Sequence, residues 1–182
     1  MEFIIIGALV LLVVFAVGQY NRLVRLNIQV DEAFAQIEVQ LKRRADLIPN
    51  LVETVKGYAA HEQSTFDAVV AARAKATSAS SVADTAAADG LLTQALRGLL
   101  AVDEAYPDLK ASANFAALQD ELATTENKVA FSRQFYNVTV RQLNTAIKTV
   151  PTNFFAGFAK VSEREFYEVE DPQDREVPNV KF

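Results

Sequence analysis

Residues 20–62 carry the clearest structural signal in this chain, and they read YNRLVRLNIQVDEAFAQIEVQLKRRADLIPNLVETVKGYAAHE. They follow almost directly on Phe3–Gly18, a run without a charged side chain that reads FIIIGALVLLVVFAVG. From Leu23 onward, apolar residues recur at spacings of three and four, which places them on one face of a helix. We therefore expect an amphipathic helical body that leaves a membrane with almost no linker.

The uncharged run is a candidate membrane anchor. As a helix it measures about 24 Å, which is less than the roughly 30 Å of a bilayer's hydrocarbon core. Extension through Tyr20, with the Arg22 side chain reaching back to the headgroups, closes part of that gap. We predict an anchor over residues 1–20, and the residues that contact the bilayer are predicted to include Phe3, Ile6, Leu9, Leu12, Phe15, Tyr20 and Arg22.

A cleaved signal peptide is the alternative interpretation, because Ala16–Gly18 has the small residues of a cleavage site. Signal peptides begin with basic residues, whereas this chain begins with Met1 and Glu2. This difference favours an anchor that stays attached. Arg22 and Arg25 follow the run and no Lys or Arg precedes it, so the positive-inside rule predicts a cytoplasmic body and an N-terminus outside.

Composition excludes several classes of protein. With 182 residues, the chain has room for one membrane segment and one globular unit of about 160 residues. The absence of cysteine excludes disulfides and thiol chemistry. The net charge of −5 is concentrated in residues 163–176, and the basic surface of a nucleic-acid-binding protein is missing.

The first helical pattern is interrupted at Pro49. Proline removes a backbone hydrogen bond and clashes with the carbonyl four residues earlier, here that of Ala45. Two outcomes are open: the helix stops after Arg44 and restarts with Asp46 as its N-cap, or it continues with a kink. The next pattern extends over residues 47–76.

The remaining segments predict an all-α fold. We expect a loop or frayed helix end over residues 76–90, a short helix over 91–105, and a long helix over 115–150, capped by Ser112 or Asn114, whose apolar seam resembles a coiled coil. The complete prediction is a transmembrane helix, then an antiparallel, coiled-coil-like bundle of about four helices over residues 21–160, then an acidic tail over 161–182. Because the short helix covers less than half of the long one, the uncovered seam predicts a second copy as partner.

Three stretches of the sequence resemble the LemA family of bacterial membrane proteins. They read YNRLV, EVQLKRRADLIPNLVETVKGYAAHE and FAALQDELATTENKVAFSRQFYN, and the resemblance extends from Phe3 to Phe158. It implies an N-terminal transmembrane helix with a helical bundle, in the bacterial inner membrane. It also implies a link to envelope biology, including magnetosome membranes.

The sequence offers little for catalysis or metal binding. His61 is the single histidine, whereas metal sites in helical bundles use paired Glu-x-x-His motifs. A Gly-rich phosphate loop, a serine elbow and a cysteine nucleophile are all missing. We therefore predict no catalytic residue, no metal site, no cofactor and no enzymatic activity.

Two groups of side chains are candidates for a structural or binding role. Polar residues near Pro49 and on the long helix are candidates for one buried network that fixes helix register or contacts another subunit. They are Arg43, Arg44, Asp46, Asn50, Glu126 and Asn127. Phe154, Phe155 and Phe158 form an aromatic cluster that either folds back on the end of the bundle or contacts the membrane or another subunit.

Two functional hypotheses follow from these features. In the first, the protein is a membrane-anchored scaffold that assembles into a large homo-oligomer and shapes or organises the inner membrane. In the second, it is an adaptor that presents its acidic tail or its phenylalanine cluster to another envelope protein, such as a membrane protease.

Overall fold

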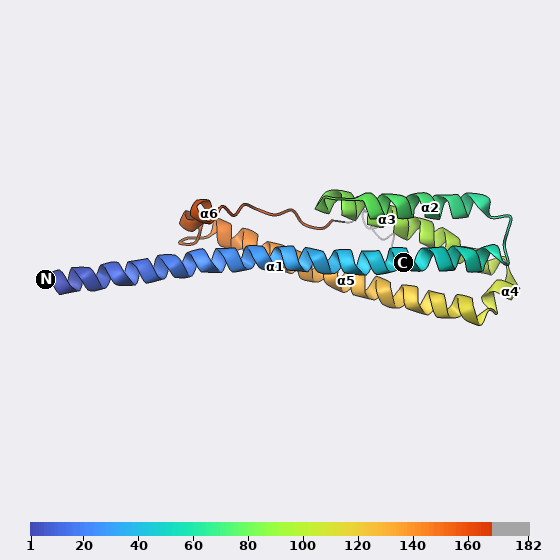
Figure 1. Ribbon diagram of the computed structural model, residues 1–182, viewed down its shortest axis with the longest axis horizontal. Coiled ribbons are helices and arrows are strands. Elements are labelled where there is room, and N and C mark those ends of the chain that lie inside the picture. Colours follow the sequence, from blue (N-terminus) through green and yellow to red (C-terminus); the bar gives the residue numbers. More distant parts are fainter. Residues whose placement is uncertain (169–182) are drawn as a thin grey trace, which may run out of the picture. The chain divides into compact units, whose positions relative to one another are not determined.

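The computed structural model describes residues 1–168, and the described part consists of helices joined by short connections (Figure 1). It contains no strand, which confirms the predicted all-α class. The acidic tail beyond residue 168 lies outside the described residues. In chain order the elements are α1 (Glu2–Lys56), α2 (Gln63–Ser78), α3 (Val82–Leu100), the 3-10 turn η1 (Ala101–Glu104), α4 (Pro107–Lys110), α5 (Ala113–Lys148) and α6 (Asn153–Ala159).

Helix α1 continues through Pro49 and has 55 residues, so the chain does not stop after Arg44. Proline has no N–H to donate to the carbonyl of Ala45. The Nε of Arg73, on α2, donates to that carbonyl oxygen at 2.8 Å. A side chain from a neighbouring helix therefore replaces the backbone donor that proline lacks.

The single helix predicted over residues 47–76 is wrong, because the structure divides it into α1 and α2. Helix α1 ends at Lys56 and the chain turns over residues 57–62. Glycine at position 57 weakens a helix by about 1 kcal/mol relative to alanine, and the backbone N–H of Ala59 closes the turn on the Val55 carbonyl at 2.9 Å. The turn allows Phe66 of α2 to enter the same apolar cluster as Val55.

The loop predicted over residues 76–90 is also wrong for most of its length, because α3 begins at Val82. Ser81 caps this helix: its hydroxyl accepts a hydrogen bond from the Asp84 N–H at 3.0 Å. The small side chains here are mostly alanine, the strongest helix former. Helix α3 therefore has 19 residues against 36 in α5, and the predicted difference in helix length shrinks.

The long helix α5 forms close to its predicted bounds. The Phe115 N–H donates to the Ser112 hydroxyl at 3.4 Å, so Ser112 is the cap. The helix ends at Lys148, shortly before Pro151.

The chain forms two compact units. Unit 1 comprises residues 1–36 and 132–166, and unit 2 comprises residues 37–131 together with Tyr167 and Glu168.

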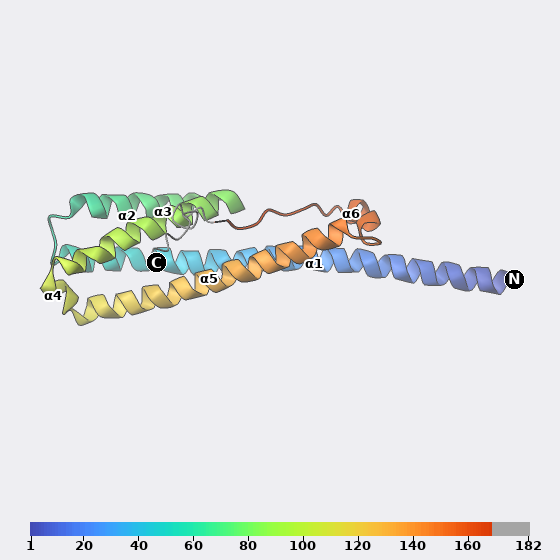
Figure 2. The same cartoon turned by 180° about the vertical axis from the view of Figure 1, so that it is seen from behind.

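Within unit 1, the first part of α1 and the last part of α5 lie side by side (Figures 1 and 2). The rings of Phe34 and Tyr136 are 5.7 Å apart, and Gln19 bonds Thr152. Because the earlier residue of α1 meets the later residue of the other segment, the two segments run in opposite directions. The fully buried apolar side chains of this seam are Leu23, Val30, Ala33, Val140 and Leu143.

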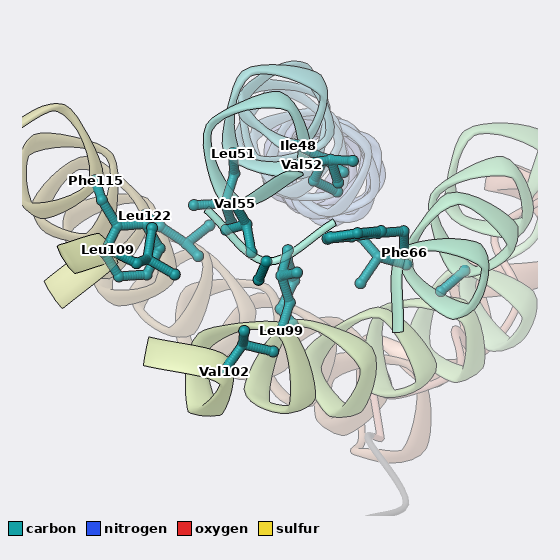
Figure 3. Close-up of a cluster of buried hydrophobic side chains, with 14 of the residues drawn as sticks. Ile48, Leu51, Val52, Val55, Phe66, Leu99, Val102, Leu109, Phe115 and Leu122 are labelled. Carbon is teal, nitrogen blue, oxygen red and sulfur yellow. The ribbon is translucent and has the colours of Figure 1, made fainter. Parts of the chain in front are cut away.

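Unit 2 contains the larger core (Figure 3). All of its helical segments contribute to one cluster of buried apolar side chains, because each has an apolar face at helical spacing. The cluster consists of Ile48, Leu51, Val52, Val55, Ala59, Phe66, Val69, Ala72, Leu92, Leu96, Leu99, Val102, Leu109, Phe115 and Leu122.

Candidate functional site

The most distinctive polar site is a buried ion-pair cluster in unit 2 around Arg44. The Arg44 side chain on α1 is 3% exposed, and its Nη1 lies 2.8 Å from the Oδ1 of Asp89 on α3, which is 1% exposed. Its Nη2 lies 2.8 Å from the Oε2 of Glu126 on α5. One guanidinium thus connects three helices through two carboxylates.

Two hydroxyl groups complete this cluster. The Nη2 of Arg44 also donates to the Thr93 hydroxyl at 3.0 Å, and the Tyr167 hydroxyl donates to the Oδ2 of Asp89 at 2.8 Å. Within residues 1–168, the buried Nε of Arg44 has no hydrogen-bond partner. Because charges without partners are costly in a protein interior, such a cluster disfavours any other register of the three helices.

The structure brings together only part of the predicted polar network. Arg44 and Glu126 are paired. Arg43 instead binds Glu121 at 3.0 Å on the surface, and Asp46 binds Lys42, four residues earlier, at 2.8 Å. The two predicted amides, Asn50 and Asn127, are both exposed.

Asp89, Thr93 and Tyr167 are members of the cluster that the sequence-based prediction missed. Asp89 had a usable signal, because it stands three residues before Leu92 and seven before Leu96, on the apolar stripe of α3. An acid on a buried stripe requires a cationic partner. The assignment of residues 76–90 to a loop concealed this signal, and Tyr167 has no local signal of its own.

The predicted anchor residues all lie on α1, either in its apolar first part or just after it. This stretch is long and apolar enough to cross a membrane. Every predicted anchor side chain is exposed in the isolated chain, namely Phe3, Ile6, Leu9, Leu12, Phe15, Tyr20 and Arg22.

The phenylalanine cluster lies on α6, in unit 1, and its members have different surroundings. The Phe155 ring packs edge-on against the Phe15 ring of α1, with centroids 6.4 Å apart. The Thr152 hydroxyl donates to the Oε1 of Gln19 at 3.0 Å. Phe154 and Phe158 are 67% and 81% exposed. Helix α6 therefore docks on α1 with one phenylalanine and leaves two uncovered.

Two tyrosines have perturbed acidity. A hydrogen bond from Tyr106 to Glu62 raises the pKa of that phenol. Burial, and then the charge of Glu165, raise the pKa of Tyr136, whose hydroxyl donates to the Glu165 carbonyl at 2.9 Å. Both hydroxyls serve as structural donors at neutral pH.

His61 lies exposed in the turn between α1 and α2. Residues 1–168 bring together no group of three or more histidine, cysteine or acidic side chains that could hold a metal ion. The candidate functional features are therefore three: the buried ion-pair cluster around Arg44, the apolar first part of α1, and helix α6.

The sequence model of the LemA family matches residues 33–182. The chain belongs to the LemA family. This match confirms the resemblance that the three quoted stretches indicated, and it begins after the apolar run.

The relatives of this LemA-family chain include a protein named LemA and magnetosome proteins named MamQ. It is 28% identical over 143 residues to Protein LemA of Metamycoplasma hominis, which covers 77% of this chain and 64% of that protein. It is 25% identical over 172 residues to Magnetosome protein MamQ of Magnetospirillum gryphiswaldense, covering 79% of this chain and 63% of that protein. It is 23% identical over 185 residues to Magnetosome protein MamQ 2 of Paramagnetospirillum magneticum, and the match covers 87% of this chain and 68% of that protein. The chain thus spans about two thirds of the length of these relatives.

Proposed function

We propose that this protein is a membrane-anchored helical scaffold that self-assembles on the bacterial inner membrane and organises it. In this proposal α1 crosses the bilayer once, with the N-terminus outside and the remaining helices on the cytoplasmic side. The names of the magnetosome relatives support a role at a membrane. The role is structural and includes no catalytic step.

The observation that carries the proposal is the composition and exposure of the first part of α1. Its large apolar side chains are exposed around the whole helix, from 89% at Phe3 to 48% at Phe15. A helix that is apolar on every side is stable only inside a larger protein or a membrane. Within residues 1–168 none of its side chains is buried, and the Phe155 ring of α6 is the one aromatic contact with it, on Phe15, so lipid is the surrounding that its chemistry fits.

Self-assembly is supported by apolar side chains that each unit leaves uncovered. In unit 1, Phe135 and Val138 of α5 are exposed and lie three residues apart on one face of the helix. In unit 2, Val39 and Phe131 are 63% and 70% exposed. Neighbouring exposed apolar groups mark interaction surfaces.

A second copy is the partner that the anchor favours. Anchoring confines all copies to one plane with one orientation, so the Phe135 face of each copy lies at the same height above the bilayer. This confinement raises the effective concentration of identical faces without any new contact.

The test is the mass of the full chain in mild detergent, measured by light scattering with the micelle contribution subtracted. We expect a multimer, and we expect Phe135→Ser with Val138→Ser to shift it toward the monomer. Phe158→Ser is the matched control, because it removes an equally apolar, exposed ring from a different helix and should leave the mass unchanged. A monomer at micromolar concentration would overturn the proposal of self-assembly.

The adaptor hypothesis is tested by deleting only the part of the tail that makes no described contact. Tyr167 is 3% exposed and donates to Asp89, so a deletion of residues 163–182 would remove part of the folded structure. Deletion of residues 169–182 leaves this contact intact. If the protein is an adaptor that acts through its tail, the shortened chain should lose its partner in pull-down experiments while its own oligomeric mass is retained.

A further inference from the structure

Unit 1 contains a cavity of about 330 Å³ between α1 and α5. Arg22 and Leu26 line it from α1, and Arg141, Gln142, Thr145 and Thr149 line it from α5. No acidic side chain is among the lining residues. Within residues 1–168, neither arginine takes part in an ion pair. The cavity therefore concentrates two uncompensated positive charges and several neutral hydrogen-bonding groups.

The position of Arg22 along α1 places this cavity at a specific depth in the bilayer. Arg22 is four residues beyond Gly18, the last residue of the uncharged run, which corresponds to about 6 Å along the helix. The headgroup layer on each side of a bilayer is about 5–8 Å thick. If α1 spans the membrane, the Arg22 guanidinium lies among the phosphates of one leaflet.

Helix α6 provides an independent indication of the same depth. Phe155 packs on Phe15, which is still inside the uncharged run, and Thr152 bonds Gln19, one turn before Arg22. The exposed rings of Phe154 and Phe158 therefore lie at the level where the hydrocarbon begins. An aromatic group at this level is stabilised by contact with acyl chains.

We propose that the cavity between Arg22 and Arg141 binds the phosphate of an anionic phospholipid, with α6 resting on the acyl boundary beside it. Guanidinium groups bind phosphate oxygens through paired, charge-assisted hydrogen bonds. Two arginines without an acidic neighbour favour a headgroup with net negative charge. A zwitterionic headgroup would bring an ammonium group into the same positive field. The inference rests on the proposed membrane anchoring and is independent of self-assembly.

The main test is native mass spectrometry of the full chain in dodecyl maltoside with added phosphatidylglycerol or phosphatidylcholine. We expect preferential retention of phosphatidylglycerol. Arg22→Gln and Arg141→Gln should each weaken its binding about 5-fold. Arg25→Gln is the matched control: it removes the same charge three residues from Arg22, but Arg25 does not line the cavity, so binding should be unchanged. Equal binding of the two lipids, or an equal loss with Arg25→Gln, would overturn the proposal.

A competition arm separates a lipid headgroup from free phosphate, since both offer the same oxygens. Inorganic phosphate at millimolar concentration should not displace phosphatidylglycerol, because the acyl chains of the lipid contribute to binding by lying along α1. Displacement by inorganic phosphate would assign the cavity to a soluble phosphate and overturn the lipid assignment.

A fluorescence arm tests the depth of α6. The chain has no tryptophan, so Phe158→Trp introduces a single emitter. In vesicles of phosphatidylcholine and phosphatidylglycerol at 3:1, brominated acyl chains should quench it. Phe135→Trp, at an exposed site of unit 1 next to Tyr136, which packs on Phe34 twelve residues beyond Arg22, should escape quenching even if a second copy covers it. Equal quenching at both positions, or at neither, would refute the assigned depth, while vesicle flotation of the same samples reports anchoring separately.

Discussion

Unit 1 and unit 2 are both built from segments of α1 and α5, yet they stabilise themselves in different ways. Unit 2 adds α2, α3, η1 and α4 to these segments and buries a continuous apolar cluster with an ion pair inside it. Unit 1 has one main seam between two antiparallel segments, and its ion pairs Arg164–Asp31 and Lys148–Glu163 lie at the surface.

The contrast indicates where each unit obtains its stability. Unit 2 surrounds one large apolar cluster with its own helices and leaves a few apolar side chains, such as Val39 and Phe131, exposed. Unit 1 leaves the apolar first part of α1, two phenylalanines of α6 and the Phe135 face uncovered, and under the proposed function lipid and other copies supply the missing contacts. The stability of unit 1 should therefore depend on its surroundings. The stability of unit 2 should depend on substitutions in its interior.

The largest expected effect comes from the ion pair of unit 2. Arg44→Met removes the guanidinium from the buried Asp89 carboxylate and should lower the free energy of unfolding by about 3–5 kcal/mol. Hydrogen-exchange mass spectrometry of the full chain in micelles measures this, because it reports the opening of each unit separately. Arg44→Met with Asp89→Leu should recover most of the loss.

The matched control for that substitution is in unit 1. Arg164→Met breaks an exposed ion pair, so its effect should stay below about 1 kcal/mol. Similar losses for Arg44→Met and Arg164→Met would break the contrast between a buried and a surface pair.

A pair of leucines tests the apolar cores. Leu99 in unit 2 and Leu143 in unit 1 are both fully buried. Leu99→Ala should cost about 4 kcal/mol, because neighbours on several sides hold the cavity open, whereas Leu143→Ala should cost about 2 kcal/mol, because two helices can close over the gap. Urea unfolding followed by circular dichroism gives both values. A larger loss for Leu143→Ala would mean that unit 1 is the more rigidly packed unit.

The hydrogen bond from Arg73 to the Ala45 carbonyl lies in unit 2, and we expect its loss to have an intermediate effect on the free energy of unfolding. Arg73→Met removes the donor to the Ala45 carbonyl and should cost about 1–3 kcal/mol. In a Pro49→Ala background, the restored backbone N–H serves that carbonyl, so the same substitution should cost less. A double-mutant cycle on thermal unfolding measures this coupling. Equal costs in the two backgrounds would show that Arg73 contributes in another way.

The smallest effect concerns Tyr136 in unit 1. Tyr136→Phe loses the hydrogen bond to Glu165 and should cost about 1 kcal/mol at neutral pH. Because burial raises the pKa of this phenol in the folded state, the folded chain holds its proton more tightly than the unfolded chain. The contribution of this phenol to the free energy of unfolding should therefore be fully present below about pH 10 and decrease as the pH rises above that value.

Denaturant titrations between pH 8 and 11 measure this dependence. Tyr136→Phe should reduce the alkaline loss, whereas Tyr58→Phe, which alters an exposed ring, should not. An unchanged alkaline loss in Tyr136→Phe would assign it to other groups.

The sequence predicts local features of this fold well and distant ones poorly. The all-α class and the cap at Ser112 follow from periodicity and from residue types that lie close together. The path of the chain at Pro49 does not, because the deciding donor, Arg73, is 28 residues away from the carbonyl that it serves. The small polar residues at 82–90 favour a loop, whereas the helix propensity of the alanines among them decides the structure.

The candidate site shows the same limit. The sequence places Arg44 and Glu126 in one candidate polar network, because Arg44 stands near Pro49 and Glu126 stands among polar residues of the long helix, and the structure pairs them. The second carboxylate that binds Arg44 belongs to Asp89, which stands in a segment that the sequence predicts as a loop or frayed helix end. Tyr167 reaches Asp89 from a segment 78 residues later, and no short-range pattern predicts such a contact.

The bond between Arg73 and the Ala45 carbonyl has a consequence for biosynthesis. Ribosomes make the chain from the N-terminus, so the whole of α1 has been translated before residue 73 is added. Until Arg73 has been added, the turn of α1 before Pro49 lacks the donor to the Ala45 carbonyl, and this turn is the weakest part of the nascent helix. Under the proposed anchoring, the first twenty or so residues that enter the bilayer are therefore made before the segment around Pro49 gains this hydrogen bond from α2.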